Sequence, residues 1–177
     1  MRSALVSAAV LAAAVSGSLR SVAWEVDWTT CAGSEAATAI RACTRILQHG
    51  AAPADVRAIA YYDRAIARRA LRQFPGAIDD LDRAMALKPE FAAALVERGI
   101  VHYEMRQYAL AVADDTAAIA ASSELAEAWN NRSLAHLKLG QYEEATADFN
   151  RTIRLHQNYG NALINRSLGP LAPERRQ

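Results

Sequence analysis

The sequence predicts an all-α fold, a solenoid of about three stacked helical hairpins that is closed by a capping helix. Two observations carry this prediction. Residues recur at a period of 34, as in the series Arg64, Arg98, Arg132, Arg166 and the series Asp80, Asp114, Asp148. No insertion breaks the register between residues 58 and 167. A fixed period of this length is typical of stacked repeats, because one helical unit alone cannot bury its apolar face.

Residues 1–23 are expected to be a signal peptide and not part of the fold. Arg2 precedes an apolar run of 12 residues, 4–15, and small residues follow at 21–23, where a signal peptidase cleaves. The run is shorter than the about 20 residues that span a bilayer. We therefore expect an exported chain, periplasmic or secreted, that begins at Trp24 and has no membrane association after cleavage. An uncleaved N-terminal anchor is the alternative.

The charge of the chain is close to zero. It is +1 for the whole sequence, and removal of Arg2 and Arg20 makes it −1. A nucleic-acid partner usually requires a basic patch or stripe, so none is expected. With so small a net charge, long-range electrostatic attraction is not expected to be the main way in which the protein finds a ligand.

Residues 24–52 are expected to form a degenerate N-terminal helical hairpin. Ser34 is predicted to cap a helix that runs to about residue 49. Cys31 and Cys43 are predicted to form a disulfide within this hairpin. Residues 12 apart on one straight helix are about 18 Å apart, whereas a bridge needs Cα atoms within about 7 Å. The chain must therefore reverse between the cysteines. Free buried thiols, or a reactive or metal-binding pair, are the alternatives.

A regular pattern of helices follows from Pro53 onward. Helices are predicted at 53–72, 77–87, 90–105, 108–121, 124–139 and 142–155, with a capping helix at 159–168 and a flexible tail at 169–177. Ser122 or Ser123 is expected to cap the helix that begins at residue 124, and Gly140 is expected to end it.

The third unit carries the clearest family pattern, with large, small and aromatic residues at set places: Trp129, Ser133, Gly140, Tyr142, Ala145 and Phe149. These residues resemble the tetratricopeptide repeat. The resemblance implies repeats at 58–91, 92–125 and 126–159 in a domain that spans 53–168 and forms a right-handed superhelix. Three departures stand out: Asp115 holds the aromatic position 24 of the second repeat, and His102 and His136 hold the aromatic position 11.

Arginine at position 7 and aspartate at position 23 form the most regular departure from the family pattern. They predict a structural ladder of ion pairs built from Arg64, Arg98, Arg132, Arg166, Asp80, Asp114 and Asp148. Each arginine could pair within its own repeat or with the preceding one. The preceding repeat is preferred, because the unit that contains Arg166 has no aspartate at position 23. Arginines that bind an acidic ligand are the alternative interpretation.

No motif in the sequence predicts catalysis. There is no His-Glu-x-x-His motif, no glycine-rich phosphate loop and no nucleophile elbow. His102 and His136 should lie one repeat apart, too far to share a metal held at about 2 Å, and are expected in the core or at the edge of a groove. We expect no enzyme activity, no cofactor and no metal site.

The family resemblance implies a concave groove along the first helix of each repeat. The partner-binding residues would then be Tyr62, Ile66, Arg69, Val96, Ile100, Tyr103, Glu104, Asn130, Leu134, Leu137 and Lys138. The lysine and asparagine clamp that some family members use for a C-terminal carboxylate is largely absent. We expect a non-catalytic protein–protein interaction module that binds a peptide or helix of a partner protein. A structural repeat protein that forms homodimers is the alternative, and a groove covered by the protein's own chain is another.

Overall fold

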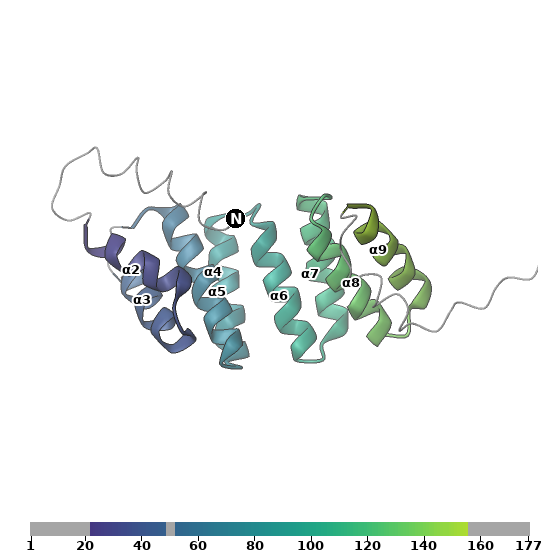
Figure 1. Cartoon of the computed structure of the whole chain (residues 1–177), viewed down its shortest axis with the longest axis horizontal. Helices are drawn as coiled ribbons and strands as arrows, with labels where there is room; N and C mark the ends of the chain where they lie inside the picture. The colour runs from purple at the N-terminus through teal and green to yellow at the C-terminus, as the bar shows by residue number, and fades with distance from the viewer. Residues whose placement is uncertain (1–21, 49–51, 156–177) are drawn as a thin grey trace, which may run out of the picture. The chain divides into compact units, whose positions relative to one another are not determined.

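The computed structural model describes residues 22–48 and 52–155, with side chains from Asp27 onward (Figure 1). This part of the chain contains eight helices and no strand, which confirms the predicted all-α fold. They are α2 (Val22–Gly33), α3 (Ala36–Gln48), α4 (Ala54–Ala70), α5 (Phe74–Leu87), α6 (Ala92–Glu104), α7 (Tyr108–Ala121), α8 (Ala126–Lys138) and α9 (Tyr142–Leu155). Almost all of the predicted signal peptide, the capping helix 159–168 with Arg166, and the tail 169–177 lie outside the described residues. No described helix has the length and hydropathy needed to cross a bilayer.

The chain forms two compact units that divide between Lys88 and Pro89. In the first, α2 packs on α3, α3 on α4, and α4 on α5. In the second, α6 packs on α7, α7 on α8, and α8 on α9. Helix α5 ends at Leu87, just before this division, because Pro89 disfavours helical geometry at the residue before it. The pairs α4–α5, α6–α7 and α8–α9 are the hairpins of the three expected repeats.

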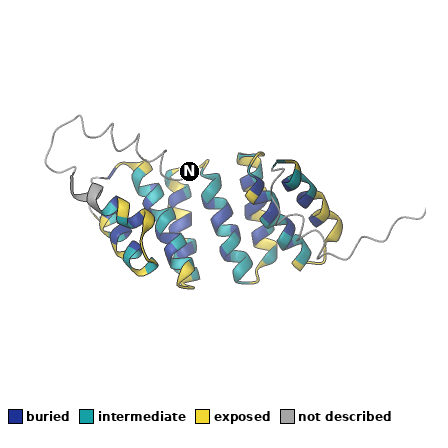
Figure 2. Ribbon diagram, in the orientation of Figure 1, coloured by how far each residue is buried: buried dark blue, intermediate teal, exposed yellow. Residues whose placement is uncertain are grey.

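Small buried residues let the two helices of each hairpin approach closely. Positions 8, 20 and 27 of the repeats are held by Ala65, Gly99, Ser133, Ala77, Ala111, Ala145, Ala84, Ala118 and Thr152, all of them buried. Buried residues recur along the helices of each unit, between half-buried and exposed ones (Figure 2). Because the side chains at positions 8, 20 and 27 are small, larger residues at other positions decide how well the space between the helices is filled.

The first helix of each repeat ends in the same left-handed turn. Position 15 has a positive φ in all three repeats: 57° at Arg72, 62° at Arg106 and 76° at Gly140. The following glutamine, for example Gln141, donates its backbone N–H to a carbonyl five residues earlier, at 3.0 Å from His136 O. This is a Schellman motif. The predicted helix end at Gly140 is confirmed, and two arginines adopt the conformation that glycine favours.

The predicted serine caps are wrong. The Ser34 hydroxyl donates to the Thr30 carbonyl at 2.6 Å, so it closes the end of α2 and does not cap α3. Helix α8 begins after Leu125 with no side-chain cap, and not at residue 124. Helix α5 begins at Phe74, three residues earlier than predicted, because Pro75 fits the first turn of a helix.

The N-terminal hairpin shares a hydrophobic core with the first half of α4, which contributes Ala60. Trp28 and Ile46 are buried there with Cys31 and Cys43. The two cysteines lie side by side, with Cα atoms 4.9 Å apart. The chain reversal that a bridge requires lies at the end of α2, so the geometric condition for the predicted disulfide is met.

Candidate functional site

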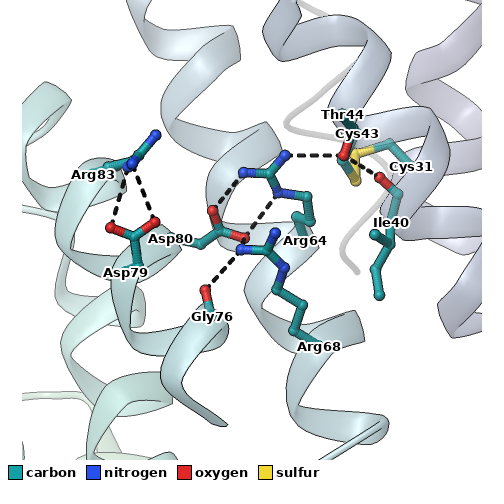
Figure 3. A network of polar contacts seen from close by, with 10 residues as sticks. All are labelled: Cys31, Ile40, Cys43, Thr44, Arg64, Arg68, Gly76, Asp79, Asp80 and Arg83. Atoms are coloured by element: carbon teal, nitrogen blue, oxygen red, sulfur yellow. Dashed lines mark hydrogen bonds and ion pairs between the residues drawn. A yellow bond between two sulfur atoms is a disulfide. The ribbon is translucent and has the colours of Figure 1, made fainter. Parts of the chain in front are cut away.

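An arginine and an aspartate pair inside each repeat. In the first repeat, Arg64 donates from Nε and Nη2 to the two carboxylate oxygens of Asp80, at 2.9 and 2.6 Å (Figure 3). Arg132 makes the same two contacts with Asp148, both at 2.7 Å. All three aspartates are buried, and Arg98 binds Asp114 in the same way.

The preference for pairing with the preceding repeat is therefore wrong for the three described arginines. The helices of one hairpin put positions 7 and 23 opposite each other, 16 residues apart in sequence. A period of 34 alone does not distinguish this arrangement from pairing across repeats. Buried bidentate pairs of this kind contribute geometric specificity more than net stability, because desolvation offsets the attraction.

Arg64 and Arg132 also reach the preceding hairpin, each through a threonine. Arg64 donates from Nη1 to the Thr44 hydroxyl at 2.9 Å, and Arg132 donates to the Thr116 hydroxyl at 3.1 Å. Thr116 is position 25 of its repeat, and Thr44 has the equivalent place when the N-terminal hairpin is aligned with its offset of 38. Sequence reasoning missed this link, although the two threonines are at matching positions.

Position 11 faces the same aspartates. Arg68 donates to Asp80 at 2.8 Å, while Nε2 of His102 lies 3.6 Å from Asp114 and Nε2 of His136 lies 3.9 Å from Asp148. The histidines thus belong to the polar strip between the two helices of a hairpin. Among the described residues, no group of His, Cys, Asp and Glu side chains could hold a metal ion.

The second unit contains a pocket of about 300 Å³ between α6, α7 and α8. It is lined by Gly99, Ile100, Tyr103, Glu104, Asp115, Asn131 and Leu134. Ile100, Tyr103, Glu104 and Leu134 were predicted groove residues, and the structure brings these four together. Pockets for small ligands begin at about this volume.

The pocket arises where two side chains are too small to fill the hairpin. Positions 8 and 24 hold Ala65 and Leu81 in the first repeat, and Ser133 and Phe149 in the third, all fully buried. The second repeat has Gly99 and Asp115 at these places. A Cβ atom on Gly99 would lie only 3.1 Å from Asp115 Oδ1, so the absent side chain leaves space for the carboxyl group.

Asp115 is a buried acid without a partner. The residue is 1% exposed, and neither carboxyl oxygen has a hydrogen bond. Burial raises the pKa of the carboxyl group to about 9, and the nearby charge of Asp114 adds to the shift. Nδ2 of Asn131, another lining residue, is also buried and unpartnered. The sequence signal for this site was an aspartate at the aromatic position of a repeat.

The matches to known proteins agree with this geometry. Residues 126–165 match the family model of the tetratricopeptide repeat. The first such domain of Spaghetti (RPAP3), solved with the HSP90 peptide SRMEEVD, has a TM-score of 0.62 and 21% identity over 64% of this chain and 90% of that chain. The chain therefore has the fold of tetratricopeptide repeat proteins, and residues 126–165 match that family in sequence.

Two further solved structures have a similar fold. MamA from Desulfovibrio magneticus RS-1, from residue 41 to its end, has a TM-score of 0.70 and 21% identity over 83% of this chain and 81% of that chain. YrrB is described as a tetratricopeptide repeat protein with an unusual peptide-binding site. It has a TM-score of 0.65 and 19% identity over 75% of this chain and 66% of that chain. No curated protein sequence matches this chain.

Some of the remaining groove residues predicted from the tetratricopeptide pattern are buried and so cannot line an accessible groove. Val96 and Asn130 are buried, with 3% and 8% of their surface exposed, so they belong to the packing between helices. Leu137 packs against the core around Phe149, and Lys138 is exposed at the end of α8. The predicted groove residues of the first unit, Tyr62, Ile66 and Arg69, are half-buried on α4.

Proposed function

We propose that this chain is an exported, non-catalytic adaptor that holds an extended or helical segment of a partner protein against the pocket of its second unit. The pocket lined by Ile100, Tyr103 and Leu134 carries the proposal. Its surface is largely apolar, and its walls include four residues that the family resemblance assigned to a groove. Apolar walls with few polar groups suit recognition of a peptide.

The relatives support a peptide as the ligand class. RPAP3 domains of the same fold were solved with an HSP90 peptide and an HSP70 peptide, and YrrB is described as having a peptide-binding site. Export is supported by the pattern of residues 1–23 and by the paired cysteines, since disulfides persist in oxidising compartments. Mass spectrometry of the protein from its native source tests this part: a mature chain that begins at Trp24 supports export, and an intact Met1 contradicts cleavage of a signal peptide.

Site-specific photo-crosslinking tests the binding face. A photoreactive amino acid at Tyr103, inside the pocket, is compared with one at Ala113, which is exposed on α7 and does not line the pocket. Crosslinks from Tyr103 alone to one defined segment of a second protein are expected. Equal crosslinking from both positions would contradict a specific face.

The captured segment is then made as a synthetic peptide and titrated by fluorescence anisotropy. Tyr103→Ala should weaken its binding at least about tenfold, which corresponds to about 1.4 kcal/mol, because the ring forms part of the pocket wall. Ala113→Ser serves as the matched control and should bind as the wild type does. Equal affinity of wild type and Tyr103→Ala would overturn the proposal.

Self-association is the second candidate, favoured by the repeat architecture, in which terminal repeats need a polar outer face or a cover. Light scattering after size-exclusion chromatography distinguishes the two. A mass that stays monomeric over a wide concentration range supports the adaptor. A dimer whose contacts include the Tyr103 crosslinker supports self-association.

A further inference from the structure

We propose that the pocket between α6, α7 and α8 is a subsite for one basic side chain of the partner, a lysine or arginine whose cationic end pairs with the carboxylate of Asp115. This inference rests on the proposed function, because the bound segment supplies the side chain. It adds the chemical class of residue that the pocket selects.

The first support is an acid that the fold buries and leaves without a partner. Both oxygens of Asp115 are inaccessible and lack a hydrogen bond, and the residue lines the pocket. Buried polar groups are otherwise almost always paired. Leu81 and Phe149 fill the same position of the other repeats, so a carboxyl group is not needed here for packing. An unpaired carboxyl group in a residue that lines a pocket suits a ligand that brings its own donor, and the Asp115 side chain must turn toward the cavity to meet that donor, because both oxygens are buried without a ligand.

The charges around Asp115 select the sign of that ligand. Asp114 on the same helix, Glu127 on α8 and Asp148 on α9 all disfavour its negative charge, and Arg132 alone among the main contributors favours it. Arg132 is already bound to Asp148. Glu104 adds a further carboxyl group to the pocket wall. An anionic ligand would meet a negative field, whereas a cation would be attracted.

The walls fit the rest of such a side chain. Ile100 and Leu134 are apolar and suit the alkyl stem of lysine or arginine, which packs on apolar surface while its end is solvated or paired. The Tyr103 ring also lines the pocket and can face a cation. Burial raises the pKa of the Tyr103 phenol, so it stays neutral across the range in which Asp115 titrates. The unpartnered Nδ2 of Asn131 remains free to donate to a carbonyl of the bound segment.

Binding of a cation must displace a proton. With a pKa of about 9, the carboxyl group of Asp115 is almost entirely protonated at neutral pH. A cation binds the ionised form of Asp115. Its affinity should therefore increase nearly tenfold for each unit by which the pH is raised, up to about pH 9. An alkylammonium ion keeps its charge over this range, because its pKa resembles that of lysine, about 10.4. A neutral ligand would show no such dependence.

The probes for this test are small molecules of matched size. n-Butylamine and n-propylguanidine represent the ends of lysine and arginine, n-butyramide is the neutral comparison, and butyrate is the anionic one. Each is titrated into the full chain at about pH 6.5, 7.5 and 8.5 and followed by NMR shifts of the pocket residues. The ¹³Cγ shift of Asp115 reports its ionisation directly.

The two cations should bind, and their affinity should increase nearly tenfold for each unit of pH increase. Their binding should move the Asp115 signal toward that of a carboxylate. Asp115→Asn should abolish this binding, and Gly99→Ala should weaken it by pressing on the carboxyl group. Glu144→Gln, which removes an exposed charge on α9 outside the pocket, should leave it unchanged. Equal binding of n-butyramide and n-butylamine, or full cation binding by Asp115→Asn, would overturn the inference.

The crosslinked partner segment separates this inference from the proposed function. If the segment binds the pocket face but lacks a basic residue needed for affinity, and the cations do not bind, the adaptor function stands and the basic subsite is wrong. If the cations bind and Tyr103 crosslinks to no partner, the subsite stands and the adaptor function is wrong. If replacing one lysine or arginine of the segment by glutamine weakens binding to the wild type but not to Asp115→Asn, both stand.

Discussion

Asp115 should make the stability of the protein fall as the pH rises. The pKa of its carboxyl group is about 9 in the folded protein and 3.8 in an ordinary environment. Below about pH 4 both the folded and the unfolded chain hold the proton, and the stabilising effect of proton binding to the folded state is fully present. Between about pH 4 and 9 the unfolded chain ionises while the folded chain keeps the proton, so stability is lost progressively.

The size of the effect follows from the pKa difference. Each pH unit inside the window corresponds to about 1.4 kcal/mol, so the free energy of unfolding should fall by about 3 kcal/mol between pH 6 and pH 8 through Asp115 alone. The variant Asp115→Asn has nearly the same shape and cannot titrate. Its stability relative to the wild type should therefore increase by about 3 kcal/mol over the same two pH units.

Urea unfolding followed by circular dichroism at the two pH values measures this difference. All other titrating groups are common to both proteins, so their effects cancel in the comparison. Glu144→Gln is the control and should follow the wild type in parallel, because its carboxyl group is exposed. Parallel curves for the wild type and Asp115→Asn would refute the reasoning, since they would mean that Asp115 titrates normally.

Three further changes test other features. Asp115→Leu should raise the free energy of unfolding at neutral pH by about 2 kcal/mol or more, seen in urea; a loss would mean that the pocket is too tight for leucine. Gly140→Ala should cost about 1 kcal/mol at its positive φ, whereas Arg106→Gly should cost nothing or stabilise; the reverse order would exclude conformational strain. Cys31→Ser with Cys43→Ser should cost about 3 kcal/mol by calorimetry under oxidising conditions, and no loss would mean that the thiols are free.

The helices were predictable because the repeat period fixes them. Helices α7 and α9 have the predicted bounds, 108–121 and 142–155, and Gly140 ends α8 as expected. Serine caps were not predictable from composition: Ser34 has a residue type that favours helix starts, yet its hydroxyl is used at the end of the preceding helix. Local preference is weaker here than the geometry of the hairpin turn.

The candidate site was predictable only in part. Its walls, such as Ile100 and Leu134, follow from the family pattern, since that pattern says which side of a helix faces a groove. The cavity itself does not follow from the pattern, because an unfilled space depends on the sizes of all the neighbouring side chains together. Asp115 was visible as a departure from the repeat, but only the structure places Gly99 against it and so explains the space. Val96 had a groove position by pattern and is buried, because it packs with Ala118 and Ala128.

The pairing of arginine and aspartate within one repeat bears on how such an array can lengthen. Since Arg132 and Asp148 belong to the same 34 residues, a duplicated repeat carries both charges with it. Arg132 contacts the preceding repeat through the hydroxyl of Thr116, and loss of that hydroxyl leaves the Arg132–Asp148 pair intact. Had the charges been paired across the boundary, every gain or loss of a repeat would have left an ionised group without its partner at one end. Gene duplication can therefore change the number of repeats without compensating substitutions at the buried arginine and aspartate positions.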